Sequence, residues 1–161
     1  MDGPVEKPEL IFNKTTGNCR FAVQDFYYKY FGKFLLPEQI LLPEAYKHIG
    51  RFIFQEQEVD FDKLKVGDIV YAKKIFNKNG NNILKTKQDY KDEDEWILYS
   101  HSAIFLGKAT DKIKTLFSEY DLPEDKELVW HATSYEGKSC VWTVEKFVEK
   151  YHIIAVKRLI K

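Results

Sequence analysis

The stretch LKVGDIVYA, residues 64–72, marks the point where the sequence changes from a helical to a strand pattern. Its first half, Leu64 to Asp68, has the composition of a turn, and Ile69 to Ala72 is a run of strand-forming side chains. Before this stretch, apolar residues recur at steps of three and four, which predicts a helix that begins near Cys19 and ends near Gly32. The residues that carry this helical pattern are Cys19, Ala22, Val23, Phe26 and Tyr30.

The second half of the chain supplies further short strands. We expect strands at 96–106, 128–132, 139–142 and 153–160, and a short helix at 144–151 with Thr143 as its N-cap. A second helical stretch is expected around Pro37 and Pro43. Because helices come first and strands follow with short connections, the sequence predicts an α+β fold in which N-terminal helices pack on an antiparallel β-sheet.

The chain of 161 residues fits a single domain, 1–161, since it contains no internal repeat and no linker. Residues 1–13 are predicted to be an N-terminal arm. Residues 75–95 are predicted to be an exposed loop insertion, which turns at Asn79-Gly80 and ends in a run of charged side chains.

Composition excludes several classes of protein. Lys and Arg together number 25, as do Asp and Glu, so the net charge is zero and we expect no nucleic-acid partner. No apolar run approaches the roughly 20 residues of a membrane-spanning helix. Residues 1–10 lack the cationic start and apolar stretch of a signal peptide, so we expect a cytoplasmic protein. Two cysteines are too few for a disulfide scaffold, and the sequence leaves the oligomeric state open.

Cys19 is the candidate nucleophile. A cysteine reacts as its thiolate, and a helix N-terminus lowers the pKa of a thiol because the helix dipole favours negative charge there. The alternative is that Cys19 is a small buried hydrophobe, which is the commoner role of a free cysteine. Cys140 lies in the middle of a predicted strand, where this second role is expected.

His101 and His131 are the candidate partners of Cys19. Each lies at the end of a predicted strand, and His101 shares a strand face with Ala103 and Phe105. Each histidine alone could be structural, whereas two on neighbouring strands favour a joint role. His48 and His152 are expected at the surface or in packing. Cys19, His101 and His131 lack the spacing of a zinc site, and no phosphate-binding glycine motif occurs, so we expect neither a metal nor a cofactor.

Four segments in this order resemble the NlpC/P60 family of papain-like cysteine peptidases: GNCRFAVQ (17–24), LKVGDIV (64–70), HSAIFLG (101–107) and VWHAT (129–133). The resemblance covers 18–159. It implies a papain-like fold and a Cys-His-His triad, in which Cys19 is the nucleophile, His101 the general base and His131 the residue that orients His101. It also implies hydrolysis of an amide bond in a small peptide, such as a cell-wall peptide, through a thioester acyl-enzyme.

The chain departs from the family pattern beside the cysteine. The family usually carries Asp before the cysteine and Ser after it, where this chain has Asn18 and Arg20. Because those residues are associated with holding the amino terminus of the substrate, the identity of the substrate stays open. Two alternatives also stay open: a catalytically inactive binding module of the same fold, and an acyltransferase that passes the thioester to an acceptor other than water.

Overall fold

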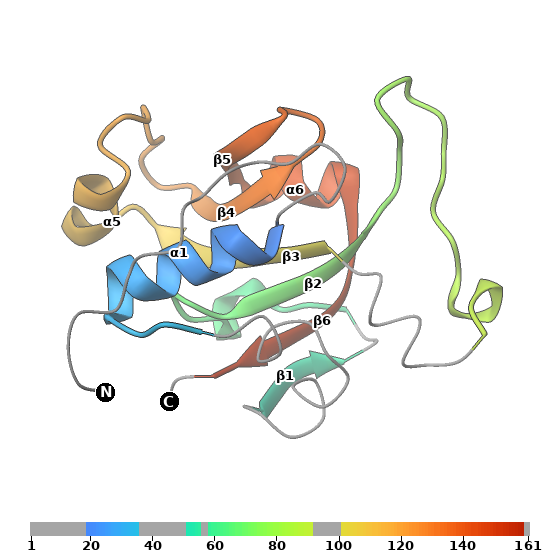
Figure 1. Cartoon of the computed structure of the whole chain (residues 1–161), viewed down its shortest axis with the longest axis horizontal. Helices are drawn as coiled ribbons and strands as arrows, with labels where there is room; N and C mark the ends of the chain where they lie inside the picture. The colour runs from blue at the N-terminus through green and yellow to red at the C-terminus, as the bar shows by residue number, and fades with distance from the viewer. Residues whose placement is uncertain (1–18, 36–50, 56–57, 92–100, 160–161) are drawn as a thin grey trace.

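A computed structural model of the chain describes residues 19–35, 51–55, 58–91 and 101–159 (Figure 1). The described part contains three α-helices and a six-stranded sheet in which every neighbouring pair is antiparallel. The predicted α+β class is therefore confirmed. The strand order is β1-β6-β2-β3-β4-β5, with β1 (Arg51–Gln55), β2 (Ile69–Lys74), β3 (His101–Lys108), β4 (Glu127–Thr133), β5 (Lys138–Thr143) and β6 (Tyr151–Arg158).

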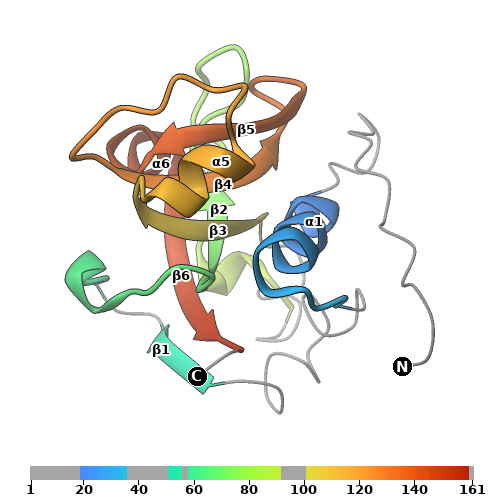
Figure 2. The same ribbon diagram turned by 90° about the vertical axis from the view of Figure 1, so that its left-hand side faces the viewer.

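Two helices cover opposite faces of the sheet (Figure 2). Helix α1 (Cys19–Phe31) packs on one face of β3 and β4, and α6 (Val144–Lys150) packs on the other face. A third helix, α5 (Asp111–Leu116), follows β3 and buries Ile113 on the α1 side. Because side chains alternate between the two faces of a strand, each strand contributes residues to two separate hydrophobic cores. The α1 side buries Ala22, Val23, Phe26, Ile104, Leu106 and Trp130, and the α6 side buries Ala103, Phe105, Val129, Trp142, Phe147 and Tyr151.

Two side-chain hydrogen bonds fix the direction of α1 across the sheet. Trp130 Nε1 on β4 donates to the carbonyl of Ala22 at 3.0 Å. The Tyr27 hydroxyl, further along the helix, donates to the carbonyl of Gly67 at 2.5 Å, just before β2. Gly67 has φ +95°, and a Cβ there would lie 2.6 Å from the Phe31 ring, so this close approach requires glycine. Helix α1 therefore runs from the end of β4 toward the start of β2.

A buried ion pair joins the turn before β2 to the last residue of β6. Arg158 donates from Nε to Asp68 Oδ1 at 2.8 Å and from Nη2 to Asp68 Oδ2 at 2.7 Å. Both side chains are at least nine-tenths buried. Asp68 Oδ2 also accepts the backbone N–H of Lys65, and Arg158 Nη2 donates to the carbonyl of Lys63. The Gly-Asp turn seen in the sequence is thus tied to the C-terminal strand through a two-point contact.

Most predicted elements in the described range are present. The strands predicted in the second half correspond to β2, β3, β4, β5 and β6, and Thr143 caps α6 by accepting the Lys146 N–H at 3.2 Å. Strand β1 and helix α5 were not predicted. The predicted arm, the helical stretch around Pro37 and Pro43, residue Asn18 and the first part of strand 96–106 lie outside the described residues.

The predicted insertion leaves the sheet as a long excursion (Figure 1). Within its described part, 75–91, Phe76 and Asn82 form an isolated antiparallel bridge around the turn predicted at Asn79-Gly80. The Asn77 side chain closes this turn by accepting the N–H groups of Asn79 and Asn81 at 2.9 Å each. A short 3-10 helix at Phe61–Lys63 precedes β2, and another at Lys87–Asp89 lies in the insertion.

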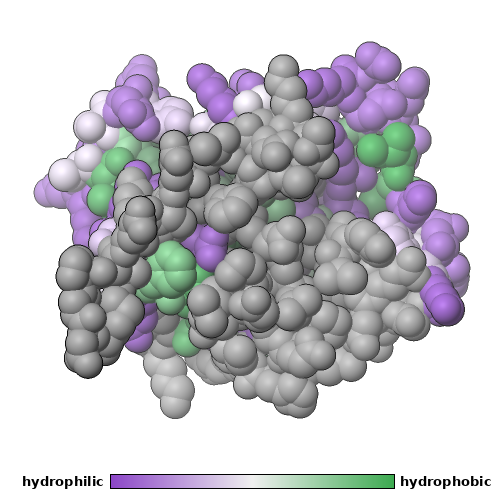
Figure 3. Space-filling view, in the orientation of Figure 1, coloured by the Kyte–Doolittle hydropathy of each residue, from purple (hydrophilic) through white to green (hydrophobic). Residues whose placement is uncertain are grey.

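None of the described helices is long and apolar enough to cross a bilayer. Where described residues are visible in the space-filling view, hydrophilic side chains predominate (Figure 3). The large apolar side chains exposed within the described part are Phe34, Ile83 and Val148, which lie on three different segments.

We expect Asp68→Asn to destabilise the fold by about 3–5 kcal/mol, because it leaves the Arg158 guanidinium buried without its counter-ion. Urea denaturation measures this loss. Glu145→Gln is the matched control, since Glu145 pairs with Lys126 at the surface and its loss should cost under about 1 kcal/mol. Equal effects of the two variants would contradict a structural role for the buried pair.

Candidate active site

His101 and His131 lie in direct contact. His101 is the first residue of β3, and His131 lies on β4 one residue after Trp130, which pairs with Ile104. The register brings His101 Nε2 within 2.9 Å of His131 Nδ1, a hydrogen-bond distance. The two rings are 5.1 Å apart at 75°. These two residues, the histidine pair, were predicted on neighbouring strands, and the structure brings them together.

Aromatic side chains hold the histidine pair in place. The Tyr151 ring stacks on His101 at 4.4 Å and 17°, and its hydroxyl lies 2.7 Å from Thr133 Oγ1. Phe147 of α6 also stacks on Tyr151, at 4.9 Å, and lies 5.3 Å from His131, and Trp142 of β5 meets His131 edge to face at 4.5 Å. His131 is fully buried as a result. Neither imidazole can turn without displacing these rings.

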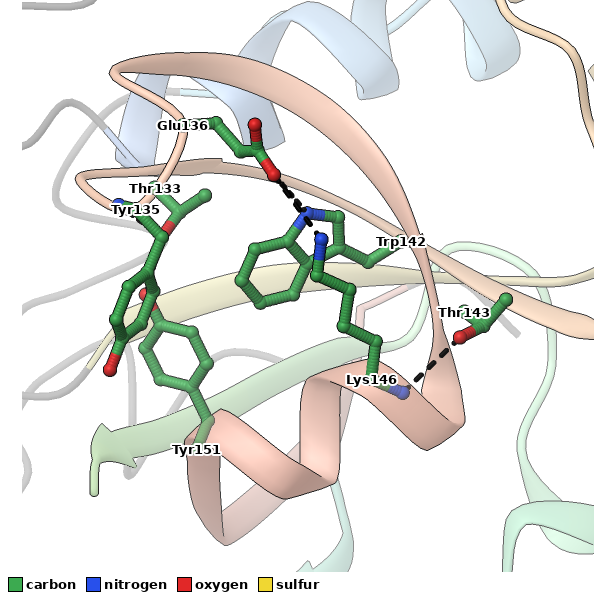
Figure 4. Close-up of polar contacts among 7 residues, drawn as sticks. All are labelled: Thr133, Tyr135, Glu136, Trp142, Thr143, Lys146 and Tyr151. Carbon is green, nitrogen blue, oxygen red and sulfur yellow. Dashed lines mark hydrogen bonds and ion pairs between the residues drawn. The ribbon is translucent and has the colours of Figure 1, made fainter. Parts of the chain in front are cut away.

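Polar contacts with Glu136 and Lys146, two exposed residues, hold the Trp142 side chain in place (Figure 4). Glu136 Oε1 accepts hydrogen bonds from Trp142 Nε1 at 3.3 Å and from Lys146 Nζ at 3.2 Å. The Lys146 ammonium also lies 4.4 Å above the Trp142 ring. Because the Trp142 ring contacts His131, these contacts of Glu136 and Lys146 with Trp142 also support the geometry of the histidine pair.

Burial keeps both histidines neutral. Burial, with a smaller contribution from the positive charge of Lys74, lowers the pKa of His101 from 6.5 to about 3. Burial also lowers the pKa of His131 well below its usual value, and His101 and Lys146 add to this. Both rings are therefore neutral at pH 7, so one donates and the other accepts in the bond between them. His131 Nε2 is buried, and none of the described residues forms a hydrogen bond with it.

Cys19 lies on α1, which packs on the face of the sheet opposite the histidine pair. It is the first residue of α1 and is buried, with 9% of its surface exposed. His101 lies on the α6 face, because it pairs with Ala72 and shares its strand face with Ala103 and Phe105, as predicted. Since α1 covers the opposite face, cysteine and histidines come from two sides of the sheet.

Cys19 and the histidine pair nevertheless lie toward the same end of the sheet. Helix α1 runs toward β2 from the region where β4 ends, which is also where β3 begins with His101. Burial raises the pKa of Tyr151, and Cys19 adds to this rise, so its sulfur lies within electrostatic range of the Tyr151 hydroxyl. Tyr151 itself stacks on His101. The structure thus joins two of the three predicted residues directly and brings Cys19 near the ring that covers them.

Several residues of the site were not predicted. Tyr151, Trp142 and Thr133 support the pair, and only Thr133 lies in a segment that carried the family resemblance. Cys140 faces His131 across β4 and β5, which its sequence neighbours do not reveal. Burial raises the pKa of Cys140 to about 12, so this thiol is inert at neutral pH, in line with its predicted role as a buried hydrophobe. His152 is exposed as predicted, and His48 lies outside the described residues.

Among the residues that the structure describes, no group of three or more His, Cys, Asp or Glu side chains is arranged to hold a metal ion. The comparisons with known proteins add no relative: no family model matches the sequence, and no curated protein and no solved structure matches it either. The assignment of the site therefore depends on the residues and their geometry.

The histidine pair should make stability depend on pH. Because the folded pKa values lie below the value of about 6.5 in the unfolded chain, the unfolded state binds more protons as the pH falls. The contribution of the pair is complete above about pH 6.5 and is lost as the pH falls toward the folded values. Each histidine contributes a slope of up to about 1.4 kcal/mol per pH unit.

We therefore expect His131→Gln to flatten the fall in unfolding free energy between about pH 6 and about pH 4, by up to about 1.4 kcal/mol per unit. Urea denaturation at a series of pH values measures it. His152→Gln is the control, because His152 is exposed, and it should follow the parent protein. Parallel curves for His131→Gln and the parent would contradict a buried neutral pair.

Proposed function

We propose that this chain is a cysteine hydrolase of papain-like NlpC/P60 architecture that cleaves an amide bond in a small peptide. The observation that carries the proposal is the 2.9 Å contact between His101 Nε2 and His131 Nδ1. A catalytic imidazole needs a third group that fixes its tautomer, and here the contact uses Nε2 and leaves Nδ1 of His101 for the nucleophile. The resemblance assigns the same two residues the roles of base and orienting group.

In this mechanism, Cys19 Sγ transfers its proton to His101 Nδ1, while the Nε2–H of His101 donates to Nδ1 of His131. The thiolate attacks the carbonyl carbon, and a C–S bond forms as the carbonyl oxygen becomes an oxyanion. A backbone N–H at the start of α1 is suited to bind that oxyanion. Collapse breaks the C–N bond, and His101 gives its proton to the leaving amine.

Water completes the reaction. His101 Nδ1 takes a proton from the water molecule, whose oxygen attacks the thioester carbonyl. The C–S bond breaks, the acid leaves, and the proton returns to Sγ. His131 stays neutral throughout because burial lowers its pKa, so it always offers an acceptor to the His101 imidazolium.

Helix α1 supports a thiolate at Cys19. It has 13 residues and no acidic side chain in its first turn, so its dipole acts on the sulfur unopposed from within that turn. The low pKa of His101 means that its imidazolium forms only with a negative charge beside it. The proposal therefore requires Sγ and Nδ1 to come within hydrogen-bond distance when substrate binds.

A second candidate, the catalytically inactive binding module, is favoured by one observation. The histidine pair lies on the face that α6 covers, opposite the face that α1 covers. If the sheet keeps Cys19 Sγ and the His101 imidazole apart, Cys19 is a packing residue and the aromatic cluster around the histidine pair is structural.

Alkylation of Cys19 by iodoacetamide as a function of pH separates the two candidates. An activated thiol titrates at roughly 3.5–7.5, and an unperturbed one near about 8.5. We expect Cys19 to react roughly tenfold faster than an unperturbed thiol near neutral pH, and His101→Ala to remove this advantage. Cys140 is the internal control because it stays protonated, and His152→Ala is the matched histidine control. Slow labelling of Cys19 that His101→Ala leaves unchanged would favour the binding module.

Hydrolysis of small peptide amides, followed by release of free amine, tests turnover itself. Cys19→Ala should lower the rate by roughly 10³-fold or more, since it removes the only proposed nucleophile. Cys140→Ala should keep the activity. Circular dichroism checks that both variants fold. Turnover that survives Cys19→Ala would overturn the mechanism.

A further inference from the structure

A cluster of lysines lies beside His101, where the mechanism does not use it. Lys74 Nζ donates a hydrogen bond to Ser134 Oγ and lies 4.3 Å above the Tyr135 ring. Lys150 Nζ lies 5.8 Å from the centre of the same ring. Lys78 is close enough to contribute, after burial, to a lowered pKa of Lys74. We call Lys74, Lys78 and Lys150 the lysine cluster.

The register places this cluster at the histidine pair. Lys74 ends β2 two residues after Ala72, which pairs with His101, so the two side chains share one face. On the other side Lys74 pairs with Tyr151, the residue stacked on His101. The Lys150 carbonyl accepts the N–H of Ile75 at 2.8 Å, which ties the end of α6 to the end of β2.

Tyr135 is the centre of the cluster. Its ring meets Tyr151 edge to face at 5.9 Å, and Figure 4 shows the two rings side by side next to Thr133. Its hydroxyl donates to the carbonyl of Phe76, at the start of the insertion. The ring is therefore fixed between the histidine pair and the insertion, and it presents a face on which the lysines gather.

The described residues supply no carboxylate partner to the lysine cluster. Lysines elsewhere in the described part of the chain have carboxylate partners: Lys146 pairs with Glu136, and Lys126 with Glu145. Within the part of the chain that the structure describes, no carboxylate forms an ion pair with Lys74, Lys78 or Lys150, although acidic and basic residues are equal in number in the whole chain. Gathering like charges costs free energy, and an anionic ligand would recover it.

We propose that Lys74, with Ser134, Tyr135 and Lys150, forms a subsite that binds a carboxylate of the substrate next to the bond that is cleaved. This inference rests on the proposed function and names its substrate class: small peptides or acyl-amino acids with a free carboxylate near the scissile amide. The Lys74 ammonium has three N–H donors, of which Ser134 takes one and the Tyr135 ring faces another. A carboxylate therefore forms a charge-assisted bond with Lys74, and Lys150 adds long-range attraction.

Two alkylating reagents of similar size test the subsite at Cys19. Iodoacetate carries the carboxylate and iodoacetamide is its neutral analogue, and the thiolate displaces iodide from both. We expect Lys74→Gln to lower the rate with iodoacetate about fivefold or more and to leave the rate with iodoacetamide nearly unchanged. Lys74→Arg should keep the preference because it keeps the charge. Lys112→Gln is the matched control, since Lys112 also lies over a tyrosine ring, that of Tyr30, at 3.9 Å.

A second measurement does not depend on Cys19. The ring proton signals of His101 in NMR spectra are followed while N-acetylglycine, or its neutral analogue N-acetylglycinamide, is added. We expect the carboxylate probe to shift these signals in the parent protein and Lys74→Arg, and not in Lys74→Gln. Thermal melts confirm that each variant folds.

The two measurements separate the failures. If Cys19 is unreactive toward both reagents but N-acetylglycine binds through Lys74, the proposed hydrolase fails and the carboxylate subsite stands. If Cys19 is activated, but neither the relative rates with iodoacetate and iodoacetamide nor the binding of N-acetylglycine depends on Lys74, the proposed hydrolase stands and the subsite is overturned. Binding of both probes alike, or equal loss in Lys74→Gln and Lys112→Gln, also overturns it.

Discussion

The antiparallel pairing of β3 with β4 is the constraint on which the candidate site depends. It sets His101 and His131 on one face of the sheet, close enough for a single hydrogen bond between the rings. A shift of the register by one residue would turn one histidine to the opposite face and break this bond. The register is itself held by buried residues on both faces, so the chemistry of the pair is a consequence of how the two cores pack.

The histidine pair also constrains the rest of the α6 layer. His131 is fully buried and His101 partly so, and two imidazoles this close together in a desolvated site are both neutral, as their lowered pKa values indicate. Burial needs cover, which Tyr151, Phe147 and Trp142 supply as a set of stacked and edge-to-face rings. Because Tyr151 begins β6 and Phe147 lies on α6, the segment that follows β5 covers the histidine pair.

Sequence reasoning was sufficient where local patterns decide structure. The helix after Cys19, the strands from Ile69 onward and the Thr143 cap follow from spacing and capping chemistry, and they are present. The shared face of His101, Ala103 and Phe105 follows from the period of a strand. Strand β1 and the order β1-β6-β2 could not be predicted, because they depend on pairing between residues that are far apart in the sequence, such as Arg51 with Arg158 and Lys74 with Tyr151. For the same reason, neither the place of Cys140 opposite His131 nor the stacking of Tyr151 on His101 could be read from neighbours in the chain.

The position of Cys19 shows why the order of residues along the chain is not enough to define a catalytic site. The order of the cysteine and the two histidines along the chain is compatible with a triad, but the period of β3 places His101 on the side away from α1. A helix and a strand on opposite faces can still share a site where the strands end, because side chains from both layers can come together there. Cys19 is the first described residue of α1 and His101 that of β3, and Thr133, the last residue of β4, contacts Tyr151. The proposed reactive centre therefore lies at the ends of the strands. Its geometry depends on the ends of α1, β3 and β4 rather than on the core of the sheet, and the lysine cluster at the end of β2 belongs to the same end of the sheet.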